Sequence, residues 1–229
     1  MLGENPELNQ ILRDGRELLG ELVSKTDWYR DILSRLVLDE AFLASQRQSI
    51  DPNDIQIYFS PDKAFSVRAF IWEPEVKYPI HDHGAWGIVG AFINDVNEKK
   101  YMRLDDGSRA NYAQVKMISD VVLKPGETTC VLPENRGIHE MKAMNGRTSV
   151  SIHVYGQAVR KGFIYNYDPN DNTLSRVYAP SYTKKVLAIK ALGSVSAPWA
   201  EEILACAEKA DNPEYIKREC RLSLGRPKC

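Results

Sequence analysis

The 229-residue sequence has only four cysteines, almost no net charge and no long hydrophobic run. Its formal net charge is −1, from 30 basic and 31 acidic side chains, so no electrostatic field favours a nucleic acid or an acidic membrane. No apolar run approaches the ~20 residues that a membrane span requires, and the first residues lack the apolar core of a signal peptide. We therefore expect no nucleic-acid partner, no membrane partner and a cytoplasmic location.

The four cysteines, Cys130, Cys206, Cys220 and Cys229, show no CxxC spacing. This pattern predicts reduced thiols rather than a disulfide framework, as in a cytoplasmic protein. The hydrophobic fraction of 43% and the charged fraction of 27% are typical of a globular protein with a sizeable core.

The hydrophobic period divides the chain into three parts. Residues 1–50 are predicted to form a helical N-terminal segment that packs on the barrel, with leucines and isoleucines mostly three to four residues apart. Residues 51–180 change to a period of two, with many short strands separated by Gly, Pro and Asn turns, which predicts a mainly β sandwich or barrel. Residues 181–229 return to a helical period as a C-terminal extension, and the pattern leaves the oligomeric state open.

The predicted strands cover residues 55–60, 65–72, 87–93, 99–104, 117–123, 128–132, 139–143, 148–155, 162–166 and 174–177. The C-terminal helices are expected at 182–192, from 198 to about 207, and from 213 onwards.

Two of the four histidines, His81 and His83, stand one residue apart. In an extended strand both side chains leave the same face, while Asp82 points away. Neutral imidazole is a common metal ligand, so this pair offers two ligands for a divalent ion. His139 follows a loop that begins with a proline and heads a returning strand, so it can supply a third ligand. A lone histidine is more often a hydrogen-bonded core residue, but three in this arrangement favour a metal site with open coordination positions.

A third stretch, residues 149–156, also has a period of two and places Ser151, His153 and Tyr155 on one face. A hydroxyl, an imidazole and a phenol in a row can form a hydrogen-bond relay in which the histidine orients and polarises the phenol. The plain alternative is a polar stripe on the interior of the barrel.

The two histidine stretches together resemble the paired motifs of the cupin superfamily, which implies a small double-stranded β-helix barrel between the helical segments. Most metal cupins carry a glutamate ligand four or five residues after the first histidine pair, where this sequence has Gly87 and Ile88. The HDHG-x-WG, G-x-HEM and S-x-H-x-Y motifs occur in order within residues 55–180. They resemble those of cysteine dioxygenase and 3-mercaptopropionate dioxygenase, particularly the bacterial members of that family.

The resemblance implies that His81, His83 and His139 bind one Fe(II). A small thiol and O2 would be the substrates, and both oxygen atoms would be added to sulfur to give a sulfinate. Mammalian cysteine dioxygenases have a cysteine crosslinked to the active-site tyrosine in the region where Gly87 and Ile88 stand here, so we expect no crosslink.

The same resemblance makes Tyr155, held by His153 and Ser151, the donor of a hydrogen bond. Its hydroxyl would donate either to the bound oxygen or to the carboxylate of the substrate.

Four further residues are candidates for contact with the substrate. Mammalian cysteine dioxygenases bind the cysteine carboxylate with an arginine on an early strand. The matching position here is near Gln56, which resembles the 3-mercaptopropionate type. Arg68 and Arg160 are alternative carboxylate partners, although an ordinary salt bridge explains each equally well. Trp86 is expected in the wall of the pocket or in the core.

The leading hypothesis is a mononuclear non-haem Fe(II) thiol dioxygenase that acts on cysteine or 3-mercaptopropionate. One alternative is a metal-dependent cupin that acts on a small molecule other than a thiol. Another is a non-catalytic cupin that senses a ligand. An intact Ser151-His153-Tyr155 relay favours the first, because a binding module has no need of a polarised phenol.

Overall fold

The structure is a computed structural model that describes residues 10, 13–17, 19–21, 40–46, 50–194 and 198–225. The chain divides into two compact units. The barrel unit comprises Met1–Arg47, Asp51–Arg160 and Ile164–Arg176. The helical unit comprises Gln48–Ile50, Lys161–Phe163 and Val177–Cys229.

The β-strands of the described residues follow the period-two region of the sequence. They are β1 (Asp54–Phe59), β2 (Phe65–Trp72), β3 (Ile80–His81), β4 (Gly87–Ile93), β5 (Val96–Arg103), β6 (Val115–Leu123), β7 (Thr128–Val131), β8 (Ile138–Ala143), β9 (Ser149–Gly156), β10 (Phe163–Asp168) and β11 (Thr173–Tyr178).

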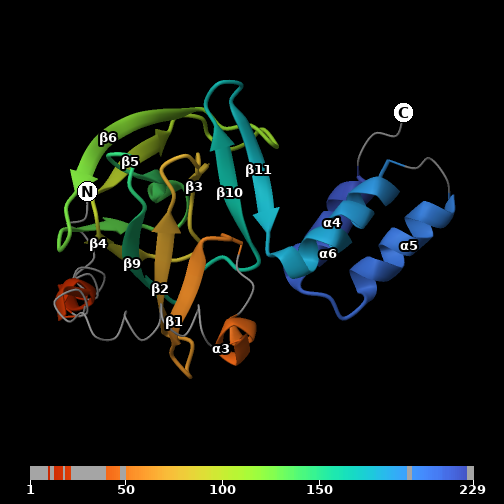
Figure 1. Cartoon of the computed structure of the whole chain (residues 1–229). Coiled ribbons are helices and arrows are strands. Elements are labelled where there is room, and N and C mark those ends of the chain that lie inside the picture. The colour runs from red at the N-terminus through yellow and green to blue at the C-terminus, as the bar shows by residue number, and fades with distance from the viewer. Residues whose placement is uncertain are drawn as a thin grey trace. The chain divides into compact units, whose positions relative to one another are not determined.

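These strands form two antiparallel sheets (Figure 1). The first has the order β1-β2-β9-β4-β7, and the second has the order β11-β10-β3-β8-β5-β6. From β2 to β10 the chain passes repeatedly between the two sheets, which is the jelly-roll arrangement that cupins share. The mainly β barrel predicted from the sequence is therefore confirmed.

All ten predicted strands are present, with bounds within a few residues of the prediction. Two differences affect the site. β5 begins at Val96, three residues earlier than predicted, and β3 is a separate strand of only two residues. The extended segment that carries His81 and His83 is therefore shorter than the sequence suggested, and His83 follows the end of β3.

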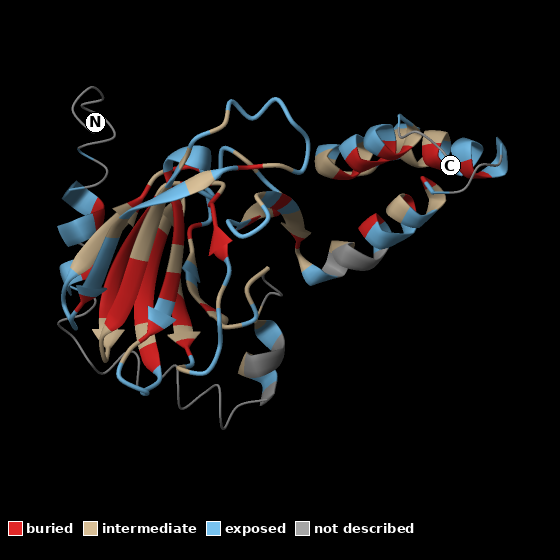
Figure 2. Ribbon diagram, turned by 90° about the horizontal axis from the view of Figure 1, so that it is seen from above, coloured by how far each residue is buried: buried red, intermediate tan, exposed pale blue. Residues whose placement is uncertain are grey.

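Hydrophobic side chains pack on both faces of the first sheet (Figure 2). One face, with Ile88, Ile152 and Val154, is covered by Leu19, which is completely buried. The other face, with Phe70 and Trp72, turns towards the second sheet. Alternation along β9 places hydrophobic residues on the first face and leaves the polar positions between them for the interior of the barrel.

The N-terminal part is helical where it is described. Residues 13–17 and 19–21 are helical, and α3 covers Glu40–Ser45. Residues 22–39 lie outside the described residues, so the helical prediction stays a prediction for that stretch.

The helical unit contains α4 (Pro180–Leu192), α5 (Pro198–Lys209) and α6 (Glu214–Leu224), which confirms the three predicted helices. Tyr178 donates a 2.8 Å hydrogen bond to the completely buried Glu219 of α6. None of the described helices has the length and apolar character needed to cross a membrane. The described cysteines, at 130, 206 and 220, are free thiols, whereas position 229 lies outside the described residues.

We expect Leu19→Ala to lower the free energy of unfolding by about 2–5 kcal/mol, because it removes a fully buried side chain from a packed face. Urea denaturation measures this change. Leu104→Ala is the matched control, because Leu104 is 48% exposed, and we expect a change within about 0.5 kcal/mol. Equal losses in the two variants would contradict the packing described for Leu19.

Candidate metal centre

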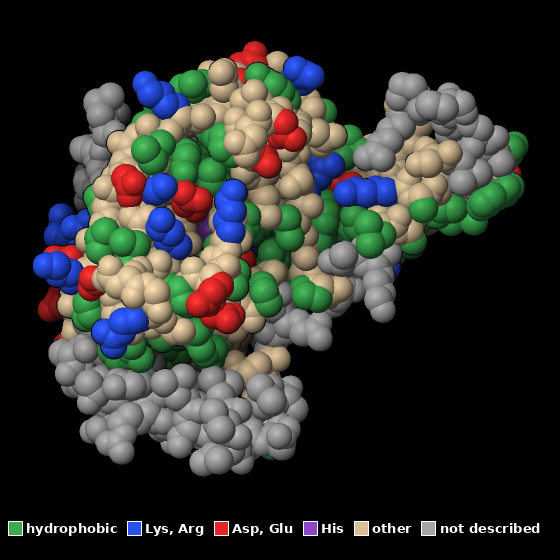
Figure 3. Space-filling view, turned by 45° about the horizontal axis from the view of Figure 1, so that its top comes forward, with side chains coloured by type: hydrophobic (Ala, Val, Ile, Leu, Met, Phe, Trp, Pro, Cys, Tyr) green, Lys and Arg blue, Asp and Glu red, His purple; other side chains and the backbone are tan. Residues whose placement is uncertain are grey.

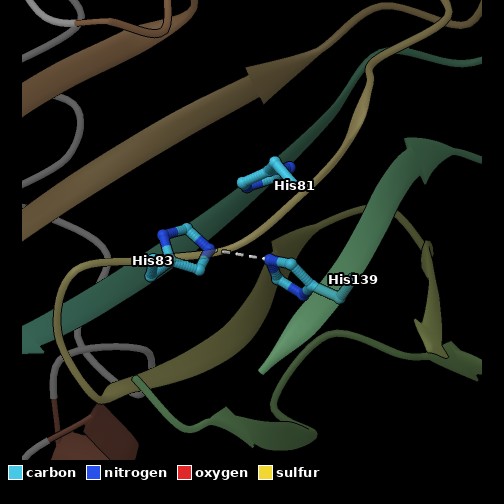
Figure 4. A group of neighbouring side chains, drawn as sticks. All are labelled: His81, His83 and His139. Atoms are coloured by element: carbon cyan, nitrogen blue, oxygen red, sulfur yellow. Dashed lines mark hydrogen bonds between the residues drawn. The ribbon is translucent and has the colours of Figure 1, made fainter. Parts of the chain in front are cut away.

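Three buried histidines meet in the interior of the barrel (Figure 4). His81 lies on β3 directly opposite His139 on β8, and His83 follows two residues after His81. One ligand nitrogen from each ring lies within 4.8 Å of the others, and the Nε2 atoms of His83 and His139 are 2.8 Å apart. The three side chains that the sequence singled out therefore form a group that could hold one metal ion.

The second ring nitrogens of two of these histidines are fixed by acceptors. His139 donates from Nδ1 to Glu98 at 2.8 Å, and His81 donates from Nδ1 to the carbonyl oxygen of Pro79 at 3.0 Å. Neither acceptor has a proton to give, so both Nδ1 atoms carry the hydrogen. In the neutral rings both Nε2 atoms therefore present lone pairs, which is the arrangement that metal-binding histidines require.

Burial favours the neutral form of two of the site histidines, His83 and His139. It lowers the pKa of His83 well below its ordinary value, and the neighbouring histidines lower it further. Burial also lowers the pKa of His139, and its hydrogen bond to Glu98 offsets only part of that effect. At neutral pH these rings are unprotonated ligands that need not lose a proton to bind a cation.

Glu98 is a candidate site residue that the sequence alone did not reveal. It lies on β5, is completely buried and faces the site from behind His139. Burial opposes its ionisation, but the hydrogen bond to His139 and the charge of Lys100, 3.5 Å away, outweigh this, so its pKa lies below the ordinary value. A carboxylate inside a strand would have pointed to this residue. The predicted strand began at Lys99, however, and therefore left Glu98 outside it.

Asp82 points away from the site, as the alternation predicted, and its carboxylate is completely buried. It accepts two hydrogen bonds from Arg160, at 2.8 and 2.5 Å, and one from the backbone N–H of Tyr165 at 2.8 Å. The sequence left two roles open for Arg160, contact with the substrate carboxylate or an ordinary salt bridge. The structure shows the salt bridge.

Ser151, His153 and Tyr155 form the row of hydrogen bonds expected from their spacing. The Oγ atom of Ser151 lies 2.7 Å from Nε2 of His153, and Nδ1 of His153 lies 2.9 Å from the hydroxyl of Tyr155. The indole N–H of Trp72, on the neighbouring strand β2, donates to Ser151 at 2.8 Å. The relay therefore has a fourth member that the sequence analysis did not identify.

Burial lowers the pKa of His153 well below its ordinary value and raises that of the Tyr155 phenol well above it. Both groups are thus neutral at neutral pH, and Tyr155 keeps the proton that a hydrogen-bond donor needs.

Gly87 provides the space for the ring of Tyr155. The two residues are paired across β4 and β9, and a Cβ atom at position 87 would lie 2.8 Å from the ring carbons of Tyr155. A side chain here, such as the glutamate that most metal cupins carry in this region, would require the ring to move. The absence of a carboxylate at this position is therefore linked to the presence of the phenol.

A small cavity of about 10 Å³ adjoins the histidines and the relay. This volume has room for about one water molecule. Its lining residues are Asp51, Asn53, Phe70, Trp72, Tyr78, Pro79, His81, His139, His153 and Tyr155. Among the described residues, no lysine or arginine lines the cavity.

The other candidates for substrate contact lie outside this lining. Gln56 on β1 pairs with Arg68 on β2, and Arg68 pairs with His153 on β9. The three side chains therefore lie on the same face of the first sheet. The guanidinium of Arg68, however, is hydrogen-bonded to Asp54. Trp86 packs with the hydrophobic cluster on the other face, which corresponds to the core position that the sequence analysis allowed.

The histidines are almost hidden from the surface. Figure 3 shows only a small area of histidine on this face, between acidic and basic side chains. His81 and His83 are 6% and 8% exposed. Access for any ligand larger than water therefore requires side chains around the cavity to move.

No protein-family model matches the sequence. Capsular polysaccharide assembling protein CapF from Staphylococcus aureus is similar at 12% identity and a TM-score of 0.37, over 58% of this chain and 34% of that protein. A Cupin 2 conserved barrel domain protein from Salinispora arenicola is similar at 16% identity and a TM-score of 0.35, over 53% and 86%. The DMSP lyase DddQ from Ruegeria pomeroyi is similar at 13% identity and a TM-score of 0.31, over 43% and 41%. The matched region is thus about a third of CapF and less than half of the lyase.

Replacing Glu98 tests its role behind His139. We expect Glu98→Gln to weaken binding of a divalent ion by about 10–100-fold, because it removes the charge that makes His139 a better ligand. Calorimetric titration with Zn(II) measures the change. Glu140→Gln is the matched control, because Glu140 follows His139 in β8 but bonds to Tyr101 at 2.8 Å instead. Unchanged affinity in Glu98→Gln would contradict the role assigned to Glu98.

The depressed pKa values of His83, His139 and His153 predict a loss of stability in mild acid. Below about pH 6.5 the unfolded chain binds protons that the folded chain does not, so stability falls with pH by up to about 1.4 kcal/mol per pH unit for each histidine. Asp51, whose pKa is raised by burial, acts in the opposite direction, but it is one group against three. Urea denaturation of the metal-free protein at pH 7.5 and 5.5 measures the difference, and a constant or rising stability would contradict it.

Proposed function

We propose that the protein is a mononuclear non-haem Fe(II) dioxygenase that oxidises a small thiol to its sulfinate. The observation that carries the proposal is the joint occurrence of three buried histidines and a neutral phenol held by a relay, with His81, His139 and Tyr155 lining one cavity. The reaction adds both atoms of O2 to the sulfur of the thiol, so it needs no external reductant. An ion-binding module would need the histidines alone.

His81, His83 and His139 would hold the iron. Their neutral imidazole nitrogens suit Fe(II), although they also suit other first-row metals. When bound, an Fe(II) ion supplies positions for the thiolate and for O2 and the spin-allowed route by which O2 reacts. The contribution of this chain is to provide three uncharged ligands and to leave those positions open.

Tyr155 would act as a hydrogen-bond donor to the reacting oxygen or to the substrate carboxylate. Its pKa is raised by burial, so it retains its proton, and its hydroxyl is held by His153. The aromatic rings of Phe70 and Trp72 line the same cavity and limit the access of water. A donor in such a dry site interacts more strongly with a developing negative charge than it would in water.

The substrate would be a small thiol carboxylate, cysteine or 3-mercaptopropionate, and the cavity would have to widen to admit it. Arg68 and Arg160, the two positively charged candidates for the carboxylate, are each engaged with an aspartate. Gln56 stays a candidate from its position on the interior face of β1. This distribution favours a neutral contact to the carboxylate over an arginine clamp, as the resemblance to 3-mercaptopropionate dioxygenase implied.

O2 consumption by anaerobically iron-loaded protein tests the reaction. The panel comprises cysteine, 3-mercaptopropionate, cysteamine and mercaptosuccinate, with the sulfinate quantified in parallel. We expect one thiol of the panel to give O2 uptake and sulfinate in a 1:1 ratio, because both atoms of each O2 are added to one sulfur. Absence of uptake with every thiol, in protein that holds one iron per chain, would instead support a cupin that acts on another substrate or only binds a ligand.

Removal of the phenol hydroxyl tests the donor. We expect Tyr155→Phe to bind iron normally and to lower turnover by about 10²–10⁴-fold, because positioned proton donors contribute factors of that size. Tyr58→Phe is the matched control, since Tyr58 is 46% exposed on β1. Turnover that is the same in both variants would remove Tyr155 from the reaction.

A further inference from the structure

We propose that Trp72 sets the direction of hydrogen-bond donation through the relay. In this arrangement donation runs from the indole of Trp72 to Ser151, from Ser151 to His153, and from His153 to Tyr155. The proton of the Tyr155 hydroxyl is then left to point into the cavity. This direction is set by the chain's own side chains and does not depend on whether the protein oxidises thiols.

The first link has only one possible direction. An indole N–H is a donor and never an acceptor, so Ser151 must accept the 2.8 Å bond from Trp72. Trp72 is 3% exposed and Ser151 is completely buried, so water does not compete for this bond. One lone pair of the serine oxygen is thereby occupied.

The second link depends on where Ser151 places its single proton. Among the described residues its oxygen has two side-chain partners, Trp72 and Nε2 of His153 at 2.7 Å. Since the first is a donor, His153 is the only acceptor that the proton can reach. Donation to Nε2 leaves the serine oxygen with no unsatisfied hydrogen.

The opposite direction would leave a buried donor without a partner. If Nε2 of His153 carried the hydrogen, the oxygen of Ser151 would accept from both His153 and Trp72. Its own proton would then face packed protein with no acceptor. An orphaned buried donor is rarer and more costly than a spare lone pair on an acceptor, so the presence of Trp72 disfavours this direction.

The third link follows from the second. His153 is 1% exposed and neutral, so it has one N–H. With Nε2 as an acceptor, the hydrogen lies on Nδ1 and is donated to the oxygen of Tyr155 at 2.9 Å. The phenol therefore does not spend its own proton on His153 and can donate it to whatever occupies the cavity. Trp72 is thus a positioning residue for Tyr155, acting through two intervening side chains.

The tautomer of His153 can be read directly. In full-length, chelator-treated protein labelled with ¹⁵N-histidine, the chemical shifts of the ring nitrogens distinguish a protonated from an unprotonated atom. The chain has only four histidines, and the His153 pair is identified as the signals missing from His153→Gln. We expect a protonated Nδ1 and an unprotonated Nε2. A protonated Nε2 in the unaltered protein would overturn the proposed direction without the need for any variant.

Two substitutions test the role of Trp72. In Trp72→Phe we expect the ratio of the Nδ1–H form to the Nε2–H form to fall by about tenfold, the value of one hydrogen bond. Ser151→Ala, which removes the donor to Nε2 with a smaller change in volume, should lower the ratio at least as far. Trp199→Phe is the matched control, since Trp199 is 53% exposed on α5. An unchanged ratio in Trp72→Phe would show that Trp72 does not set the direction of donation. If Trp72→Phe does not fold, Ser151→Ala decides instead, and an unchanged ratio in that variant would refute the relay.

Discussion

The buried ion pair between Asp82 and Arg160 fixes the stretch that carries two of the three histidines. Asp82 stands between His81 and His83 and projects to the opposite side, so its fixed position on one side determines where the two imidazoles lie on the other. β3 has only two residues, so regular strand pairing ends at His81, and beyond it single backbone bonds, such as that from the N–H of Glu134 to the carbonyl of His83, hold the segment. Removing one partner of a buried pair typically costs about 3–5 kcal/mol, so side-chain bonding replaces much of what a longer strand would provide.

Alternation along a strand was sufficient to predict the main side chains of the site. It placed His81 and His83 together, turned Asp82 away, and set Ser151, His153 and Tyr155 in one row, all within short segments of sequence. It could not show Glu98 or Trp72, because each meets its partner across a strand pairing that joins residues 41 and 79 positions apart. Such contacts depend on register between strands, which a local pattern does not contain.

Long charged side chains were the least predictable part of the site. The sequence offered Arg68 and Arg160 as carboxylate partners, and the structure gives each an aspartate partner within the barrel unit. Which carboxylate an arginine reaches depends on distances between loops and strands, and composition near the arginine does not reveal them. The geometry at Gly87 was also beyond the sequence, since the reason for a glycine lies in a tyrosine ring 68 residues further along the chain.

The burial of all four histidines determines how the charge of the folded protein changes with pH. Histidine is the side chain that ordinarily changes charge between pH 5 and 8, and every histidine of this chain is buried at or beside the candidate site. The surface is charged instead by lysine, arginine, aspartate and glutamate, which change little in that range. Moderate acidification therefore leaves the net charge and the mutual repulsion of the folded molecules almost constant, and its effect appears instead as a lower free energy of unfolding.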